Sequence, residues 1–235
     1  MTKIGLFILV ALFFGFTLEQ NSVEYPKSEL IGKFTPSAHP EFEKIPSEYT
    51  KKSNIYLRRA ALISFGKMHL AAAEAGFDLD IISATRNFSY QEGIWTRKWN
   101  RLAMSGKSDL EKVEEILTYS SMPGTSRHHW GTDIDLNNLN NKYFEDGSGK
   151  ELYNWLLENA PKFGYQQTYT SKENGRTGYN EEKWHWSYMP IAGPMLEQYN
   201  EKVSYSDIDG FPGCGQAPAI KAIEHYVNGI ASELK

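Results

Sequence analysis

The sequence predicts an α+β fold in which a small, mostly antiparallel sheet is flanked by helices. Stretches with helical spacing of apolar residues come first, and a few short strand-like segments follow, joined by long polar connections. This order differs from the regular strand–helix–strand repeats that build a parallel sheet. At 235 residues the chain is long enough for one domain with a buried core.

Residues 1–18 have the layout of a secretory signal peptide: Lys3, an apolar run from Ile4 to Leu18, and then a polar stretch. The run is shorter than the about 20 residues that a transmembrane helix needs. It lacks a clean small-x-small cleavage site, so a short membrane anchor remains the alternative. We therefore expect an exported protein, periplasmic or in the cell envelope, that stays attached to the membrane if the leader is retained.

Residues 19–50 are expected to form an extended lead-in that lies over the domain. They show no sustained hydrophobic period and contain four prolines. Residues 51–75 place apolar side chains at helical spacing and are followed by Gly76, which predicts the main core helix and its end. The alternating, isoleucine-rich segment 77–86 predicts a strand that ends at Arg86.

Three further helices and two further strands are expected along the chain. Helical patterns cover residues 90–102, 109–119 and 150–165, and strand patterns follow Gly131 and include the alternating aromatic residues of 184–188. We assign residues 51–200 to the main domain, which carries the motifs described below, and residues 201–235 to an extension made of a loop and a closing helix.

Composition excludes several classes of function. The formal net charge is −4, so no basic surface is expected to collect phosphates, and nucleic acid is not an expected partner. Cys214 is the single cysteine, so an internal disulfide is impossible. It lies in a Gly/Pro-rich loop without a neighbouring histidine, which favours an inert thiol over a catalytic one. The composition gives no indication of the oligomeric state.

The segment 126–136, SRHHWGTDIDL, combines two histidines and two aspartates around Gly131. If the chain turns at this glycine and continues as a strand, one histidine and Asp135 can reach one metal ion. On that strand Asp133 and Asp135 share a face, while Ile134 and the following leucine point to the other face. The segment EEKWHWSY supplies a second imidazole, that of His185, with Glu182 three residues earlier. A zinc hydrolase needs such ligands, an open position for water and a carboxylate base.

Together these segments resemble the VanY-like D-alanyl-D-alanine carboxypeptidases, zinc peptidases whose pattern is S-x-H-x-x-G-x-A-x-D followed later by E-x-W-H. The first motif matches residues 126–135, and the second matches residues 182–185. The upstream segment ISATRNFSYQ also resembles the family, with an arginine and, five residues later, a glutamine: Arg86 and Gln91.

The resemblance implies a role for each matched residue. It implies that Zn²⁺ is held over the sheet, in a cleft, by His128, Asp135 and His185. It implies that Glu182 is the general base, and that Arg86 either stabilises charge on the scissile carbonyl or binds the substrate carboxylate. Ser126 and Gln91 are implied to bind substrate, although Ser126 could equally cap a turn.

Two positions of the first motif need separate expectations. His129 falls where the family pattern is free, so it is expected to be exposed or to lie behind the ligands. Asp133 stands where the pattern has alanine, and such an extra carboxylate could either tune the site or point away from it.

The expected function is hydrolysis of the terminal D-Ala from peptidoglycan stem peptides. An L,D-carboxypeptidase acting on tetrapeptide stems is the alternative within enzymes, because its motifs are similar. A catalytically silent, zinc-stabilised wall-binding module is disfavoured by the presence of Glu182, and a signalling domain on the same fold would hydrolyse no peptide.

Overall fold

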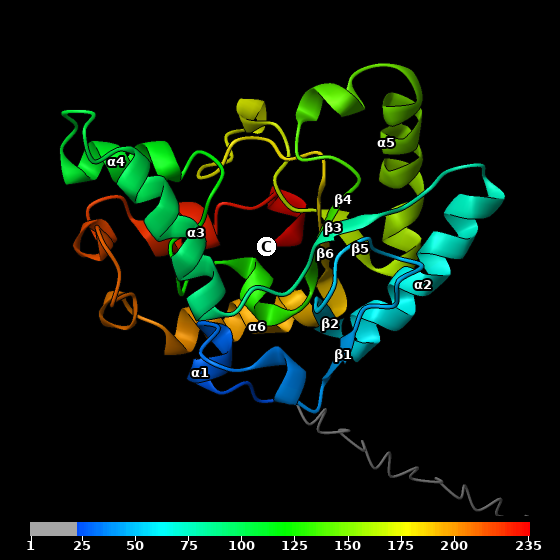
Figure 1. The fold of residues 1–235 in the computed structure, drawn as a ribbon. Coiled ribbons are helices and arrows are strands. Elements are labelled where there is room, and N and C mark those ends of the chain that lie inside the picture. Colours follow the sequence, from blue (N-terminus) through cyan, green and yellow to red (C-terminus); the bar gives the residue numbers. More distant parts are fainter. Residues whose placement is uncertain (1–22) are drawn as a thin grey trace, which may run out of the picture.

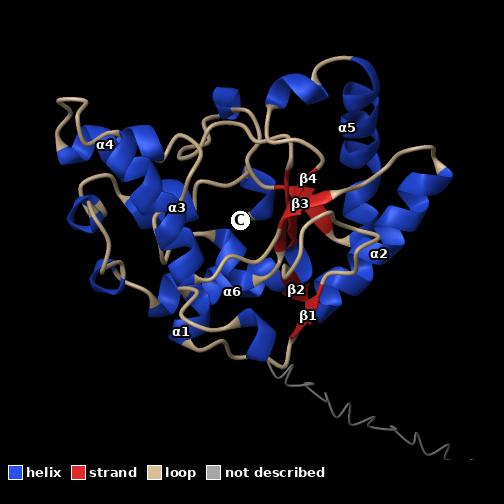
Figure 2. Ribbon diagram, in the orientation of Figure 1, coloured by secondary structure: helices blue, strands red, loops and turns tan. Residues whose placement is uncertain are grey.

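The computed structural model describes residues 23–235, so the predicted leader at residues 1–18 lies outside the described residues. The predicted α+β class is confirmed, since helices surround two small antiparallel sheets (Figures 1 and 2). Within residues 23–235, no helix has both the length and the apolar character to cross a membrane.

The main sheet has four antiparallel strands in the order β3-β4-β6-β5. Its strands are β3 (Ile81–Ser83), β4 (Asp133–Leu136), β6 (His185–Tyr188) and β5 (Tyr165–Gln167). A separate two-stranded ribbon pairs β1 (Phe42–Lys44) with β2 (Tyr56–Arg58). The strands of the main sheet are short, so its few central side chains determine what each face can bind.

One face of the main sheet is apolar and packs against helices α2 (Arg59–Glu74) and α5 (Gly147–Asn159) (Figure 1). Ile134 on β4 and Trp186 on β6 contribute to this core, and each is at most 1% exposed. Because side chains alternate along a strand, the neighbours of these residues point to the opposite face. That opposite face is polar, and it carries the candidate site.

A second hydrophobic core lies beyond the polar face, and it is built largely from helices and from both ends of the described chain. Its helices are α1 (Lys27–Leu30), α3 (Phe88–Arg101), α4 (Asp109–Ile116) and α6 (Met189–Lys202). Trp95 on α3 and Trp130 next to the motif are both at most 1% exposed in this core. The polar face therefore lies between two apolar cores, which limits its access to water.

Several predicted boundaries need correction. The helix predicted at 51–75 begins only at Arg59, because residues 56–58 pair with the lead-in as strand β2. The lead-in is therefore not extended throughout: it contains α1 and β1. The closing helix of the tail is replaced by short helical turns, the longest a π-helix at Ala222–Val227. Strand β5 and helix α6 were not predicted.

Gly131 is the backbone pivot between the histidine-bearing turn and strand β4. It has φ of +70°, a left-handed conformation that favours glycine, and it ends the 3₁₀ turn Arg127–Trp130. A Cβ at this position would overlap the ring of Phe42. The turn and the strand can therefore meet at this angle only if residue 131 has no side chain.

Gly131→Ala is expected to lower the free energy of unfolding by about 2–4 kcal/mol, since left-handed strain of about 1 kcal/mol adds to steric overlap. Gly76→Ala is the matched control, because Gly76 has φ of +84° and no atom within 4 Å of the added Cβ. Gly76→Ala should lower the free energy of unfolding only by the strain of the left-handed backbone. Urea unfolding of both variants tests this, and equal costs would show that the contact with Phe42 is unimportant.

Candidate active site

The site is organised by the pairing of strands β4 and β6. Asp135 and His185 are direct cross-strand partners in the antiparallel register, so their side chains project from the same face. The Nδ1 atom of His185 lies 3.1 Å from Oδ1 of Asp135. Both side chains are buried. The register alone thus brings together two groups that are separated by fifty positions in sequence.

His128 reaches the same point from the turn that precedes β4. Its Nδ1 donates a hydrogen bond to the carbonyl of Ala84 at 2.8 Å, which leaves Nε2 as the atom with the free lone pair. That Nε2 is buried, has no hydrogen-bond partner, and lies 3.4 Å from Oδ1 of Asp135. A buried lone pair without a partner is costly, which indicates that it has a ligand to bind.

The three side chains fit a metal ion. One ligand atom from each of His128, Asp135 and His185 can be chosen so that all lie within 4.8 Å of one another. Two imidazoles and one carboxylate are a donor set that Zn²⁺ prefers, and three protein ligands leave a position for a reacting group. In the part of the chain that the structure describes, this is the group of ligating residues with such geometry.

Glu182 lies beside this cluster. Its Oε2 is 3.7 Å from Nδ1 of His185, and its backbone N–H donates to the carbonyl of Tyr169. Burial raises the pKa of Glu182 to about 7, although the charge of His185 opposes this shift. A carboxylate with a pKa near neutrality can both accept and return a proton, as a general base must.

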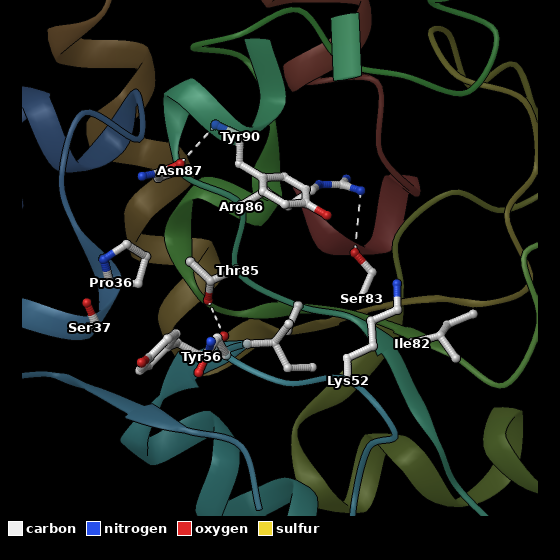
Figure 3. Close-up of a pocket in the computed structure, with 13 residues that line it drawn as sticks. Pro36, Ser37, Lys52, Tyr56, Ile82, Ser83, Thr85, Arg86, Asn87 and Tyr90 are labelled. Carbon is white, nitrogen blue, oxygen red and sulfur yellow. Dashed lines mark hydrogen bonds between the residues drawn. The ribbon is translucent and has the colours of Figure 1, made fainter. Parts of the chain in front are cut away.

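Arg86 follows strand β3 and supplies the positive charge of the site. Its Nη1 lies 4.0 Å from Oδ2 of Asp135 and donates to Oγ of Ser83 at 3.4 Å. Figure 3 shows its guanidinium group directed toward Ser83, and Arg86 lines a side pocket of about 200 Å³ together with Tyr90. The Nε atom of Arg86 is buried and has no hydrogen-bond partner.

His129 is not exposed, and the alternative expectation, a place behind the ligands, describes it correctly. It is fully buried, its Nδ1 donates to the carbonyl of Arg86 at 2.6 Å, and its Nε2 accepts from the N–H of Gly124 at 3.0 Å. Burial lowers the pKa of His129 to about 3, so the ring is neutral. One ring nitrogen thus anchors the backbone of Arg86 and the other that of Gly124, so neither is free to bind a metal.

Ser126 and Gln91 lie deeper than the other predicted residues. Each is 1% exposed. The side chain of Gln91 donates to the carbonyl of Ser121 at 2.8 Å, and the Ser126 hydroxyl has no hydrogen-bond partner. Neither residue lines the cleft described below. Their roles in binding substrate therefore stay predictions.

A cleft of about 730 Å³ opens on the cluster. Arg86, Asp135 and Glu182 line it, and so do residues that the sequence did not single out, notably Lys98 and Tyr119. Lys98 donates to the hydroxyl of Ser120 at 2.5 Å, and burial lowers the pKa of its ammonium group. Its position on the inner face of helix α3 could have been read from the helical period, but nothing in the motif indicates it.

Two histidines, an aspartate and a neighbouring buried glutamate, open to a cleft, define the site of a mononuclear metallohydrolase. The family model for D-alanyl-D-alanine carboxypeptidases of the VanY type matches residues 54–191, more than half of the chain. The chain belongs to this family.

Individual proteins with similar sequences carry the same description as the family. A D-alanyl-D-alanine carboxypeptidase of Enterococcus faecalis is 31% identical over 130 residues, which cover 51% of this chain and 46% of the relative. A D-alanyl-D-alanine carboxypeptidase of Enterococcus faecium is 27% identical over 158 residues, 66% of this chain and 45% of the relative. The chain thus spans about half the length of these relatives.

Solved structures support the fold. VanYB in complex with D-Alanine-D-Alanine gives a TM-score of 0.50 at 24% identity, covering 68% of this chain and 94% of that chain. The LdcB LD-carboxypeptidase gives 0.54 at 22% identity, covering 74% of this chain and 81% of that chain.

The geometry predicts that the protein binds one Zn²⁺ and that His128→Ala weakens this binding by more than about 100-fold, because loss of a ligand costs more than loss of an outer partner. His129→Ala should keep the 1:1 stoichiometry in its folded fraction, although it loses two buried hydrogen bonds and stability. Metal analysis and competition with a zinc indicator test both variants. Loss of the ion in His129→Ala alone would reverse the assignment of the two histidines.

Proposed function

We propose that this protein is an exported, zinc-dependent carboxypeptidase that removes the terminal D-Ala from peptidoglycan stem peptides. The observation that carries the proposal is the buried set of His128, Asp135 and His185 with Glu182 beside it. Membership in the D-alanyl-D-alanine carboxypeptidase family supports the substrate class. The leader-like pattern of residues 1–18 supports export to a compartment in which the cell wall is accessible.

A zinc ion held by the three ligands would supply Lewis acidity that activates water and polarises the scissile carbonyl. Glu182 accepts the proton of the attacking water and later delivers it to the leaving amine of D-Ala. Its burial keeps this proton close to the reacting atoms and away from bulk solvent.

Arg86 completes the electrostatics of the cleft. Its guanidinium group lies on the cleft side of Asp135, where it either stabilises the negative charge that develops on the scissile carbonyl or binds the carboxylate of the substrate. The cleft, of about 730 Å³, has room for several residues of a peptide.

Glu182→Gln is expected to lower kcat by about 100-fold or more while zinc remains bound at 1:1, because the amide cannot accept a proton. Release of D-Ala from a D-Ala-D-Ala peptide and metal analysis of the same sample test this. Glu181→Gln is the matched control, since Glu181 is the adjacent carboxylate and does not line the cleft. Unchanged turnover in Glu182→Gln would refute its role as the base.

The preferred stem length can be read from product masses. We expect pentapeptide stems to be shortened by one residue and tetrapeptide stems to be left intact, and a chelator should abolish the reaction. Shortening of the tetrapeptide alone would instead identify an L,D-carboxypeptidase. If zinc is bound and neither peptide is shortened, the protein is a wall-binding or signalling module.

A further inference from the structure

Asp133, which stands where the family pattern has alanine, lies at the centre of a buried polar network. Its Oδ2 accepts hydrogen bonds from Nε2 of His185 at 2.8 Å and from Nε of Arg127 at 3.2 Å. Its Oδ1 accepts from the hydroxyls of Ser187 at 2.5 Å and Thr132 at 2.7 Å. The carboxylate is completely buried, so it points into the protein and not away from the site.

We propose that Asp133 is a positioning residue that holds His185 in the orientation and tautomer needed to bind the metal through Nδ1. The inference rests on the zinc site of the proposed function. It assigns a role to the one position of the motif that departs from the family pattern.

The argument starts from the two nitrogens of the His185 ring. A neutral imidazole carries one N–H, and a carboxylate can only accept a hydrogen bond. Nε2 lies 2.8 Å from Oδ2 of Asp133, and Nδ1 lies 3.1 Å from Oδ1 of Asp135, so two carboxylates compete for the one proton of the neutral ring. If Asp135 binds the metal, the Asp133 carboxylate is the acceptor that remains, and the proton is held on Nε2. The lone pair is then on Nδ1, the atom that faces Asp135 and the cluster. A histidine ligand whose other N–H donates to a carboxylate is better oriented and more basic toward a metal.

The two histidine ligands are thus held in different ways. His128 donates from Nδ1 to the backbone carbonyl of Ala84, a neutral acceptor. His185 donates from Nε2 to a charged acceptor. An alanine at position 133 would offer no acceptor at all, so this hydrogen bond depends on the aspartate of this chain.

Arg127 offsets the free-energy cost of burying the charged Asp133 carboxylate. Its side chain is 0% exposed, it forms the ion pair with Oδ2, and its Nη2 donates to the hydroxyl of Ser187 at 2.8 Å. Its guanidinium group also lies over the ring of Trp130, 4.6 Å from the centroid. An unpaired charge in this place would cost several kcal/mol, so Arg127 and Asp133 depend on each other.

Zinc affinity tests the proposal directly. Asp133→Asn keeps the shape of the side chain but removes the charge and allows either nitrogen of His185 to be protonated. The zinc dissociation constant is expected to rise by about 10–100-fold, as for other carboxylates behind a histidine ligand. Thr132→Val is the matched control, because it removes one hydrogen bond to Asp133 and leaves the contact with His185 in place. Its dissociation constant should change by less than about 3-fold.

A second variant and a second measurement distinguish a loss of zinc affinity from a loss of folded structure. Asp133→Asn combined with Arg127→Met leaves no buried charge unpaired, and the same weakening of zinc binding is expected. In ¹⁵N NMR of the zinc-loaded wild type, the Nε2–H of His185 should give a strongly downfield proton signal that moves upfield in Asp133→Asn but stays in place in Thr132→Val.

The outcomes separate this inference from the proposed function. If the wild type binds zinc and releases D-Ala, but Asp133→Asn has the affinity and the NMR signal of Thr132→Val, the positioning role is overturned and the proposed function stands. If the wild type binds no zinc, both are overturned.

Discussion

The antiparallel register of β4 and β6 is the constraint on which the site depends. It pairs Asp135 with His185 and Asp133 with Ser187, so all four side chains project from one face of the sheet. A shift of β6 by one residue would turn Trp186 toward the polar side and move His185 into the apolar core. The hydrophobic core under α2 and α5 therefore stabilises this register of β4 and β6, and the register places the ligands on the polar face.

Burial gives these polar groups their chemical character. Burial lowers the pKa of His185, but its hydrogen bonds to Asp133 and Asp135 outweigh burial and raise the pKa to about 9, so Nδ1 must release a proton before it can bind a metal. Burial raises the pKa of Glu182 to about 7, because the opposing charges of His185 and Arg86 do not outweigh it. Two side chains a few ångströms apart thus both hold a proton more tightly than they would in water, His185 because of its hydrogen bonds and Glu182 because of its burial.

The sequence was sufficient to predict which side chains form the cluster, because each of the two motifs shows the alternation of a strand. Alternation around Ile134 and Trp186 indicates which side chains share a face, and Gly131 indicates the turn. His129 could not be placed, since burial of a histidine depends on acceptors from distant segments, here the carbonyl of Arg86. Helix α6 was missed because Pro190 and Pro194 suggest a break. Pro190 lies in the first turn, where its lack of an N–H costs little, but the helix also continues through Pro194 in its interior.

The core behind the motif also includes both ends of the described chain, outside the segment that defines the family. Leu30 accepts a hydrogen bond from the indole of Trp130, Gly32 leaves the space that the ring of His129 fills, and Val227 packs in the same core. The family match covers only residues 54–191. A segment cut at the bounds of this match would therefore keep the ligands but lose the apolar support beneath them.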